Sequence, residues 1–137
     1  MRRFVIKSYG DDTMYCFTIN AKLPSLNDYV AVCRRNKYQA NQFKKEVEEL
    51  IGWGIKQAQV KGELKPTDKP ITLYFEWHEK TKRRDADNVA SAKKFILDAL
   101  QTYGIIPNDN RRYVKGFQDV IIDDTKDFVF VRLIEKE

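Results

Sequence analysis

Two carboxylates one residue apart, Asp85 and Asp87, directly follow the three cations Lys82, Arg83 and Arg84. Carboxylate oxygens are ligands that Mg²⁺ prefers, and a bound Mg²⁺ can neutralise charge that develops on a phosphorus atom. Cationic side chains beside such an ion would hold backbone phosphates. This pattern is typical of a metal-dependent site that cuts phosphodiester bonds. The alternative is a solvated turn in which an Asp caps the helix that follows.

The residues after the paired carboxylates predict an amphipathic helix from about Val89 to Tyr103. At about 100° per residue, Asp87, Lys94 and Asp98 fall on the polar face of this helix. Gly104 lies at the C-terminal end of this helix, where a residue in the left-handed backbone conformation commonly ends a helix. The apolar face consists of Val89, Ala92, Ile96, Ala99, Leu100 and Tyr103. One face is therefore available to the core and the other to chemistry.

A third carboxylate must come from elsewhere in the chain, because a hydrolytic Mg²⁺ site needs several hard oxygen ligands around one point. The polar turn Pro107–Asn110 offers Asp109, although a turn-capping Asp is the simpler alternative there. The predicted helix is about 22 Å long, and the chain from Gly104 to Asp109 spans at most about 20 Å. We therefore expect this segment to run straight back along the helix within one subunit, so that Asp109 rejoins Asp85 and Asp87. The alternatives are a shorter helix and an Asp109 that acts across a dimer interface.

The rest of the chain predicts a single α+β domain spanning residues 1–137. Alternating apolar residues predict four strands, at Met14–Ile19, Ile71–His78, Tyr113–Ile122 and Lys126–Glu135. A helix is expected from about Gln39 to Val60, with one apolar stripe made of Phe43, Val47, Leu50, Ile51, Gly54 and Ala58. We expect a mixed β-sheet with two main helices packed on it.

The segment between the first strand and the long helix is expected to be irregular. Leu23–Asn27 contains turn-forming residues, and we expect Arg34, Arg35 and Lys37 in the loop that follows. Within the long helix, glycines such as Gly54 either weaken it or allow another backbone to approach closely.

The composition describes an ordinary globular chain with a moderate basic excess. A net charge of +5 suits a polyanionic partner without requiring one. Cys16 and Cys33 form no metal-type spacing with each other or with His78, so Cys16 is expected to be a buried, reduced thiol. His78 itself is expected at a surface position, where phosphate contact is one interpretation and no role is the other. No signal-peptide pattern and no apolar run of about 20 residues appear, so we expect a cytoplasmic protein without a membrane span.

Several short segments, taken in order, resemble a known family. Arg84–Asn88, Leu97–Leu100, Gly104 and Asn108–Asp109 look like the signature of the RusA-type Holliday-junction resolvases. Pro24–Asn27 is similar to that family's early element of Pro, Ser, any residue and Asn. The matching segments extend from about residue 17 to about residue 114, which is most of the chain.

The resemblance implies a Mg²⁺-dependent, homodimeric endonuclease that nicks four-way DNA junctions symmetrically in a bacterial or phage-infected cell, with Mn²⁺ able to substitute. The family's catalytic, metal-holding aspartates would fall on Asp85, Asp87 and Asp109. The family often has two adjacent Asp in the turn after the helix, but the first of these is Asn108 here. Only Asp109 is therefore assigned from that turn, and the number of metal ions stays open.

The family's catalytic lysine usually lies four residues after the second Asp, and that position is Ser91 here. Counting back from Leu97–Leu100 places the lysine at Lys94 and implies about three extra residues in the helix. Helical geometry also favours Lys94, which returns to the face of Asp87, over Lys93. The choice between the two lysines stays open.

In the mechanism implied, Mg²⁺ would activate a water and stabilise the leaving 3′ oxygen, and Lys94 would stabilise charge on the scissile phosphate or position the water. Cations would carry the arms of the junction through salt-dependent contacts that are mostly blind to sequence. These predicted DNA-binding residues are Lys82, Arg83, Arg84, Lys93, Arg111, Arg112 and Lys115.

Two other functions fit the sequence. The first is a non-catalytic module of the same fold that binds DNA junctions or regulates, which the displaced lysine favours. The second is a basic RNA-binding or ribosome-associated α+β domain, which would stack bases on aromatics such as Tyr74 and would need no aspartate.

Overall fold

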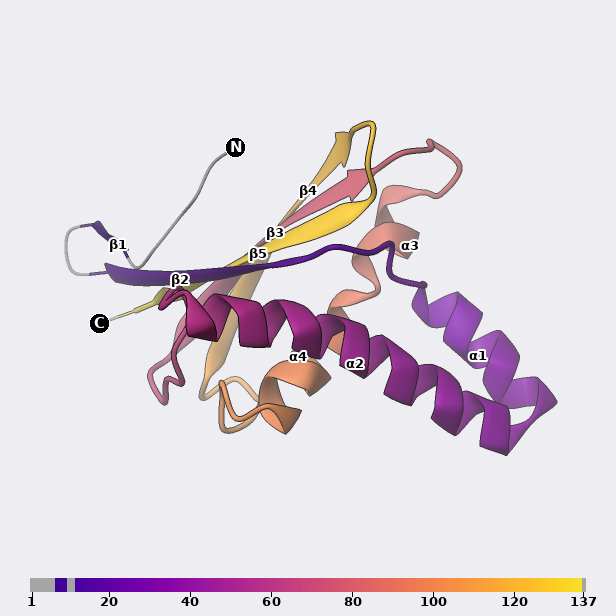
Figure 1. The fold of residues 1–137 in the computed structure, drawn as a ribbon, viewed down its shortest axis with the longest axis horizontal. Coiled ribbons are helices and arrows are strands. Elements are labelled where there is room, and N and C mark those ends of the chain that lie inside the picture. The colour runs from indigo at the N-terminus through magenta and orange to yellow at the C-terminus, as the bar shows by residue number, and fades with distance from the viewer. Residues whose placement is uncertain (1–6, 10–11, 137) are drawn as a thin grey trace.

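The computed structural model describes residues 7–9 and 12–136 (Figure 1). Five strands form one sheet in the order β1-β2-β5-β3-β4, in which β3 and β4 are parallel and the other neighbours are antiparallel. The strands are β1 (Lys7–Tyr9), β2 (Asp12–Ile19), β3 (Ile71–Glu79), β4 (Val114–Asp123) and β5 (Phe128–Glu135). The mixed α+β architecture predicted from the sequence is confirmed.

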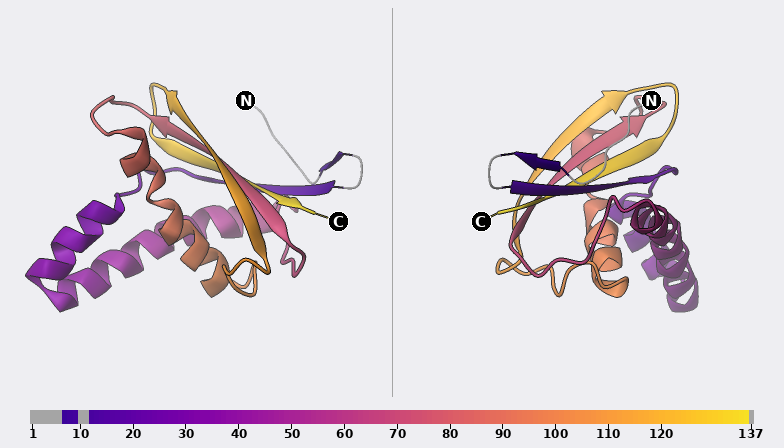
Figure 2. Two further views of the ribbon diagram at one scale, coloured as in Figure 1. Left: turned by 180° about the vertical axis from the view of Figure 1, so that it is seen from behind. Right: turned by 60° about the vertical axis from the view of Figure 1, so that its left-hand side comes forward.

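The helices lie on one face of this sheet, as Figure 2 shows from two sides. They are α1 (Leu26–Arg35), α2 (Lys37–Val60), α3 (Ala86–Ala90) and α4 (Lys93–Thr102). Both α3 and α4 belong to the crossover that joins the parallel strands β3 and β4. Parallel neighbours need such a crossover, and it carries Asp85, Asp87 and Lys94.

The predicted alternation along β3 is confirmed. Ile71, Leu73, Phe75 and Trp77 are buried beneath the helices, while the residues between them are half-buried. Phe75 and Trp77 stack with ring centroids 5.3 Å apart. Because β3 is interior to the sheet and supplies the middle of the core, it fixes where the crossover to β4 begins.

The backbones of α2 and β2 touch at Gly54. An added Cβ at Gly54 would lie 2.2 Å from the carbonyl oxygen of Thr18. The second interpretation of this glycine, close approach of another backbone, therefore applies. One member of the predicted apolar stripe is wrong, because Leu50 is 45% exposed and is not part of the core.

The loop expected around Arg34, Arg35 and Lys37 is helical instead. Arg34 and Arg35 form the last turn of α1, and Lys37 begins α2. The cause is a capping box at the start of α1: the Asp28 backbone N–H donates to Ser25 Oγ at 3.1 Å, and the Ser25 N–H donates to Asp28 Oδ2 at 2.9 Å. Basic residues in the last turn also suit the helix dipole.

The single helix expected from Val89 to Tyr103 is divided in two. α3 ends at Ala90 and α4 begins at Lys93, because the hydroxyl of Ser91 bonds outside the helical ladder. That hydroxyl donates to the carbonyl of Asn88 at 2.6 Å and accepts from the backbone N–H of Leu26 at 3.0 Å. A serine that competes for backbone bonds in this way commonly ends or bends a helix.

Other sequence-based expectations concern the thiols and membrane spans. Cys16 is buried, as predicted, whereas Cys33 is exposed on α1, and no disulfide joins them. Within residues 7–9 and 12–136, none of the helices has the length and apolar character that crossing a bilayer would take.

Candidate functional site

Two of the segments singled out from the sequence meet in space. The Leu26 backbone N–H donates to Ser91 Oγ at 3.0 Å, and Asn27 Nδ2 donates to Asn88 Oδ1 at 3.0 Å. The turn Pro24–Asn27 therefore docks on the segment that follows the paired carboxylates, although more than 60 residues of chain separate the two. This contact fixes the position of α3.

Arg84 holds the entry to α3 from the other side. Its guanidinium donates to both carboxylate oxygens of the buried Glu79, at 3.3 and 2.8 Å, and to the carbonyl of Leu23 at 3.1 Å. A buried carboxylate needs such compensation, and the bidentate geometry supplies it. The structure thus places Arg84 inside the protein, between β3 and the loop before α1, rather than on the open surface expected for a DNA contact.

Asp85 and Asp87 are both exposed at the start of α3. Asp85 has the backbone conformation of an N-cap, but its carboxylate makes no capping hydrogen bond. Asp87 Oδ1 accepts from the backbone N–H of Asn88 at 3.0 Å. Helix capping therefore does not occupy the Asp85 carboxylate, which is open to a ligand from solvent.

Asp109 reaches back to the first turn of α4. Lys94 Nζ lies 3.4 Å from Asp109 Oδ2 and 3.2 Å from Asp98 Oδ1. The return starts at Gly104, whose φ of 75° requires the left-handed region, and continues through the buried Ile105 and Ile106. The segment runs back along α4 within one subunit, but it brings Asp109 to Lys94 and not, as expected, to Asp85 and Asp87.

The two candidate lysines have different partners. The Lys93 side chain is 23% exposed, and its Nζ lies 2.5 Å from Asp119 Oδ2 and 4.6 Å from the ring centroid of Phe117. The Lys94 side chain is 53% exposed and pairs with Asp98 and Asp109. Lys94 is therefore the lysine that shares a cluster with a predicted site aspartate.

Electrostatics keep Lys94 charged. Its pKa is raised above 10.5, first by the hydrogen bond to Asp98 and further by the negative charges of Asp98 and Asp109, while partial burial acts in the opposite direction. The side chain is consequently a fixed cation at neutral pH. It can stabilise negative charge, but it cannot take up a proton.

Asp119 is a functional candidate that the sequence analysis missed. Its Oδ1 accepts from Trp77 Nε1 at 2.8 Å, and its Oδ2 pairs with Lys93. It lies on β4 opposite Phe75, so its side chain points to the same face of the sheet as the core. The available signal was a charged residue at an inward position, between Phe117 and Ile121 in the alternation of the strand.

His78 is not an idle surface residue. Nδ1 lies 2.7 Å from Asp124 Oδ2, Nε2 lies 3.0 Å from Glu76 Oε1, and the ring stacks on Phe128 at 3.9 Å between centroids. The hydrogen bond with His78 is the main cause that lowers the pKa of the Asp124 carboxyl. With two carboxylates around it, the imidazole has no position left for a phosphate.

The predicted metal ligands do not form one compact group. No three His, Cys, Asp or Glu residues of the described chain come together in a way that would hold a metal ion. Asp109 is paired with Lys94, while Asp85 and Asp87 stand at the start of α3. The two exposed carboxylates still suit Mg²⁺ in kind, because Mg²⁺ often uses one or two carboxylates together with substrate phosphates and keeps several waters.

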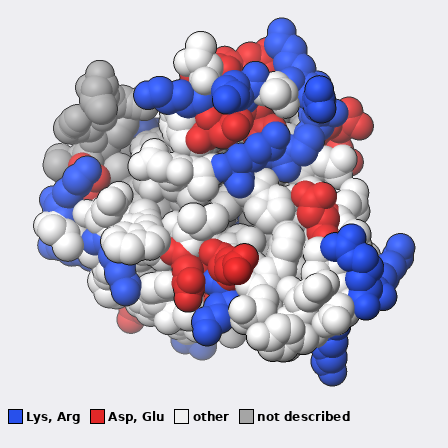
Figure 3. Space-filling view, turned by 45° about the vertical axis from the view of Figure 1, so that its right-hand side comes forward, with Lys and Arg blue, Asp and Glu red and all other residues white. Residues whose placement is uncertain are grey.

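The remaining predicted DNA-binding cations are exposed: Lys82, Arg83, Arg111, Arg112 and Lys115. Lys82 Nζ lies 3.6 Å from Asp123 Oδ2, and the guanidinium carbon of Arg112 lies 5.5 Å from the ring centroid of Tyr113. Figure 3 shows acidic side chains at several separate places on one face, with lysine and arginine side chains beside and between them.

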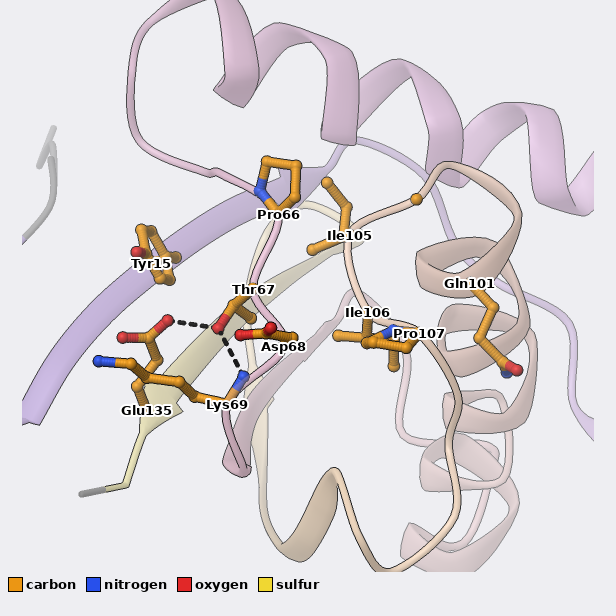
Figure 4. A pocket seen from close by; sticks show the side chains of 11 residues that line it. Tyr15, Pro66, Thr67, Asp68, Lys69, Gln101, Ile105, Ile106, Pro107 and Glu135 are labelled. Atoms are coloured by element: carbon orange, nitrogen blue, oxygen red, sulfur yellow. Dashed lines mark hydrogen bonds between the residues drawn. The ribbon is translucent and has the colours of Figure 1, made fainter.

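A hollow of about 770 Å³ opens between Pro66–Lys69, Gly104–Pro107 and the end of β5 (Figure 4). The buried Glu135 accepts a hydrogen bond from the Thr67 hydroxyl at its wall. None of the predicted site aspartates lines it. The hollow therefore accompanies the return segment but does not contain the candidate site.

Comparison with family models finds none that matches the chain, and comparison with curated proteins finds no relative. The resemblance to RusA-type resolvases accordingly stays a prediction from the residues themselves.

Proposed function

We propose that this protein is a Mg²⁺-dependent, structure-selective endodeoxyribonuclease of RusA type, which resolves four-way DNA junctions by paired symmetrical nicks. The observation that carries the proposal is the meeting of Asp109 with Lys94 at 3.4 Å. They lie fifteen positions apart in the sequence, and the resemblance assigns both to the site. Docking of Pro24–Asn27 on Asn88 and Ser91 gives further support.

In the proposed mechanism Asp85 and Asp87 would hold the metal. A Mg²⁺ ion bound there would supply an activated water and charge stabilisation for the leaving 3′ oxygen. Lys94, kept protonated by its carboxylate partners, stabilises charge on the scissile phosphate. Asp109 orients that ammonium group.

The surrounding residues hold the substrate and the site. Lys82, Arg83, Arg111, Arg112 and Lys115 bind phosphates of the junction arms, which gives strongly salt-dependent affinity. Arg84 positions Asp85 and does not bind DNA itself, because its guanidinium fixes the loop and the strand on either side of Asp85. Paired nicks require two sites, so the active form in the bacterial or phage-infected cell is a homodimer.

The test compares a four-way junction with a linear duplex, each incubated with the purified protein in Mg²⁺, Mn²⁺ or EDTA. We expect symmetrical nicks in the junction alone, and only with a divalent metal. Nicks in both substrates at equal rates would contradict junction selectivity. Cleavage that continues in EDTA would contradict the metal site.

A second candidate function is a non-catalytic module that binds junctions. The observation that favours it is that Asp85, Asp87 and Asp109 do not come together as a three-carboxylate group within the described residues. This candidate predicts salt-dependent junction binding without nicking at any metal concentration. The same incubation, with binding measured by gel shift, separates the two functions.

A further inference from the structure

Phe117 is an aromatic side chain that stays open to solvent beside the candidate site. It is 46% exposed, and among residues 13–136 every other exposed large apolar residue lies on α1 or α2. Its strand, β4, is an edge strand of the sheet, so neighbouring strands cover it from one side only. An exposed aromatic ring at such an edge is a surface on which a flat ligand can stack.

A β-bulge in β4 turns Phe117 toward the helices. Between the partners of Ile71 and Thr72 on β3, the pairing skips one residue of β4, Lys115. Because side chains alternate along a strand, this extra residue places Phe117 opposite Leu73, on the side of the sheet where the helices pack. Without the bulge the ring would point to the other face. Bulges that re-aim a side chain in this way are frequent next to active sites.

Lys93 covers part of the Phe117 ring and connects it to the candidate site. Its Nζ lies 4.6 Å from the ring centroid and pairs with Asp119 Oδ2, so the charge of that carboxylate is compensated. Lys94, the next residue along α4, pairs with Asp109. The two lysines leave the helix about 100° apart. The ring therefore lies against the first turn of α4, on the side next to the lysine proposed to contact the scissile phosphate.

Cations stand in the chain directly before the ring. Arg111, Arg112 and Lys115 are all exposed and precede Phe117 by two to six positions. Their charge is opposite to that of a phosphate backbone. Exposed aromatic rings beside cations are typical of proteins that bind single-stranded nucleic acid, in which the bases stack on the rings while the cations follow the phosphates.

We propose that Phe117 is a stacking platform for an unpaired base of the DNA substrate, with the neighbouring phosphates held by Arg111, Arg112 and Lys115. The base comes from the point where the strands of the junction cross, because a base inside a duplex would first have to be unpaired and unstacked. The inference rests on the proposed function for the identity of the substrate and adds the side chain that holds one of its bases. The platform accepts any base, since every base has a flat π face.

Fluorescence anisotropy in EDTA tests the platform without any nicking. The probes are a labelled single-stranded oligonucleotide and a duplex of the same sequence. Stacking on one aromatic side chain changes the affinity about 5- to 150-fold, so Phe117→Ala should weaken binding of the single strand at least about fivefold. Binding of the duplex should change less than about twofold, because its bases are already stacked on one another.

Two further variants separate stacking from packing. Phe117→Trp should bind the single strand at least as tightly as the wild type. Phe117→Leu, which stays apolar but has no π face, should bind it as weakly as Phe117→Ala. Trp53→Ala removes an exposed aromatic side chain on α2 and is the matched control, which should bind both probes like the wild type. Circular dichroism checks that each variant is folded.

Several results would overturn the platform. Equal weakening of both probes by Phe117→Ala would show a general defect, and no weakening of the single strand would show that the ring does not contact a base. A Phe117→Leu variant that binds the single strand like the wild type would exclude stacking. A wild type that binds neither probe would also overturn the inference.

Photocrosslinking locates the base on the protein. A single strand that carries 5-iododeoxyuridine is irradiated with the wild type, and mass spectrometry then identifies the crosslinked peptide. We expect the crosslink at Phe117. Crosslinks found only at Tyr38 or Trp53, the exposed aromatic residues of α2, would contradict the assignment.

Nicking of junctions is scored separately. Selective loss of single-strand binding in Phe117→Ala, in a protein that never nicks, would support the platform and refute the nuclease proposal. Metal-dependent nicking by a protein whose Phe117→Ala variant binds both probes normally would do the reverse.

Discussion

Replacing Arg84 by glutamine should destabilise the fold and displace the site, because it leaves Glu79 buried without its cation. The guanidinium makes two hydrogen bonds to that carboxylate and one to the Leu23 carbonyl, and its own side chain is only 18% exposed. Breaking a buried pair by removing one partner costs about 3–5 kcal/mol. Allowing for the partial exposure of the arginine, we expect a loss of about 2–4 kcal/mol in the free energy of unfolding.

Urea denaturation followed by circular dichroism measures this loss. Arg83→Gln, which alters the exposed neighbour, is the control and should change stability by less than about 0.5 kcal/mol. The double variant Arg84→Met/Glu79→Leu should recover most of the lost stability, since no charge is then left buried. A loss below about 1 kcal/mol in Arg84→Gln would refute the assignment of Arg84 as a structural anchor.

Three further predictions concern single residues. Gly54→Ala should cost a net of about 2 kcal/mol by urea denaturation, since the added methyl meets the β2 backbone and outweighs the gain of about 1 kcal/mol in helix propensity. Lys94→Gln should lower the rate of junction nicking about 10²-fold with junction binding retained, whereas Lys93→Gln should nick at the wild-type rate. The pKa of Lys94 is raised, so the stability that its ion pairs supply should be complete below pH 10.5 and should be lost as the pH rises through the folded-state pKa. Because the hydrogen bond with His78 lowers the pKa of Asp124, the stability lost in Asp124→Asn should be measurable by thermal melts above pH 3.8 and should vanish as the pH falls through the folded-state pKa.

The strands and the long helix were predictable because their signals are local. The alternation from Ile71 to His78 can bury one face only as a strand, and β3 has the predicted burial pattern. Helix rise and chain length predicted that the segment after Gly104 can run back along the helix, but not that Asp109 meets Lys94 instead of joining Asp85 and Asp87.

The errors depended on contacts between distant segments or on overlooked capping. The division of the predicted helix at Ser91 depends on the backbone N–H of Leu26, which lies 65 residues earlier. α1 was missed although Ser25 and Asp28 have the spacing of a capping box, because its residues are polar on average and none of them is fully buried. The pairing of Lys93 with Asp119 required the register of β4 on β3, which no pattern within one strand supplies.

The rate of nicking of a four-way junction by Asp85→Asn, beside the wild type at equal junction occupancy, tests the central claim most directly. We predict that the wild type cuts the junction in paired positions with Mg²⁺ and that the variant, still bound to the junction, cuts at least about 10²-fold more slowly. Equal rates for the two proteins would contradict a metal site at the start of α3.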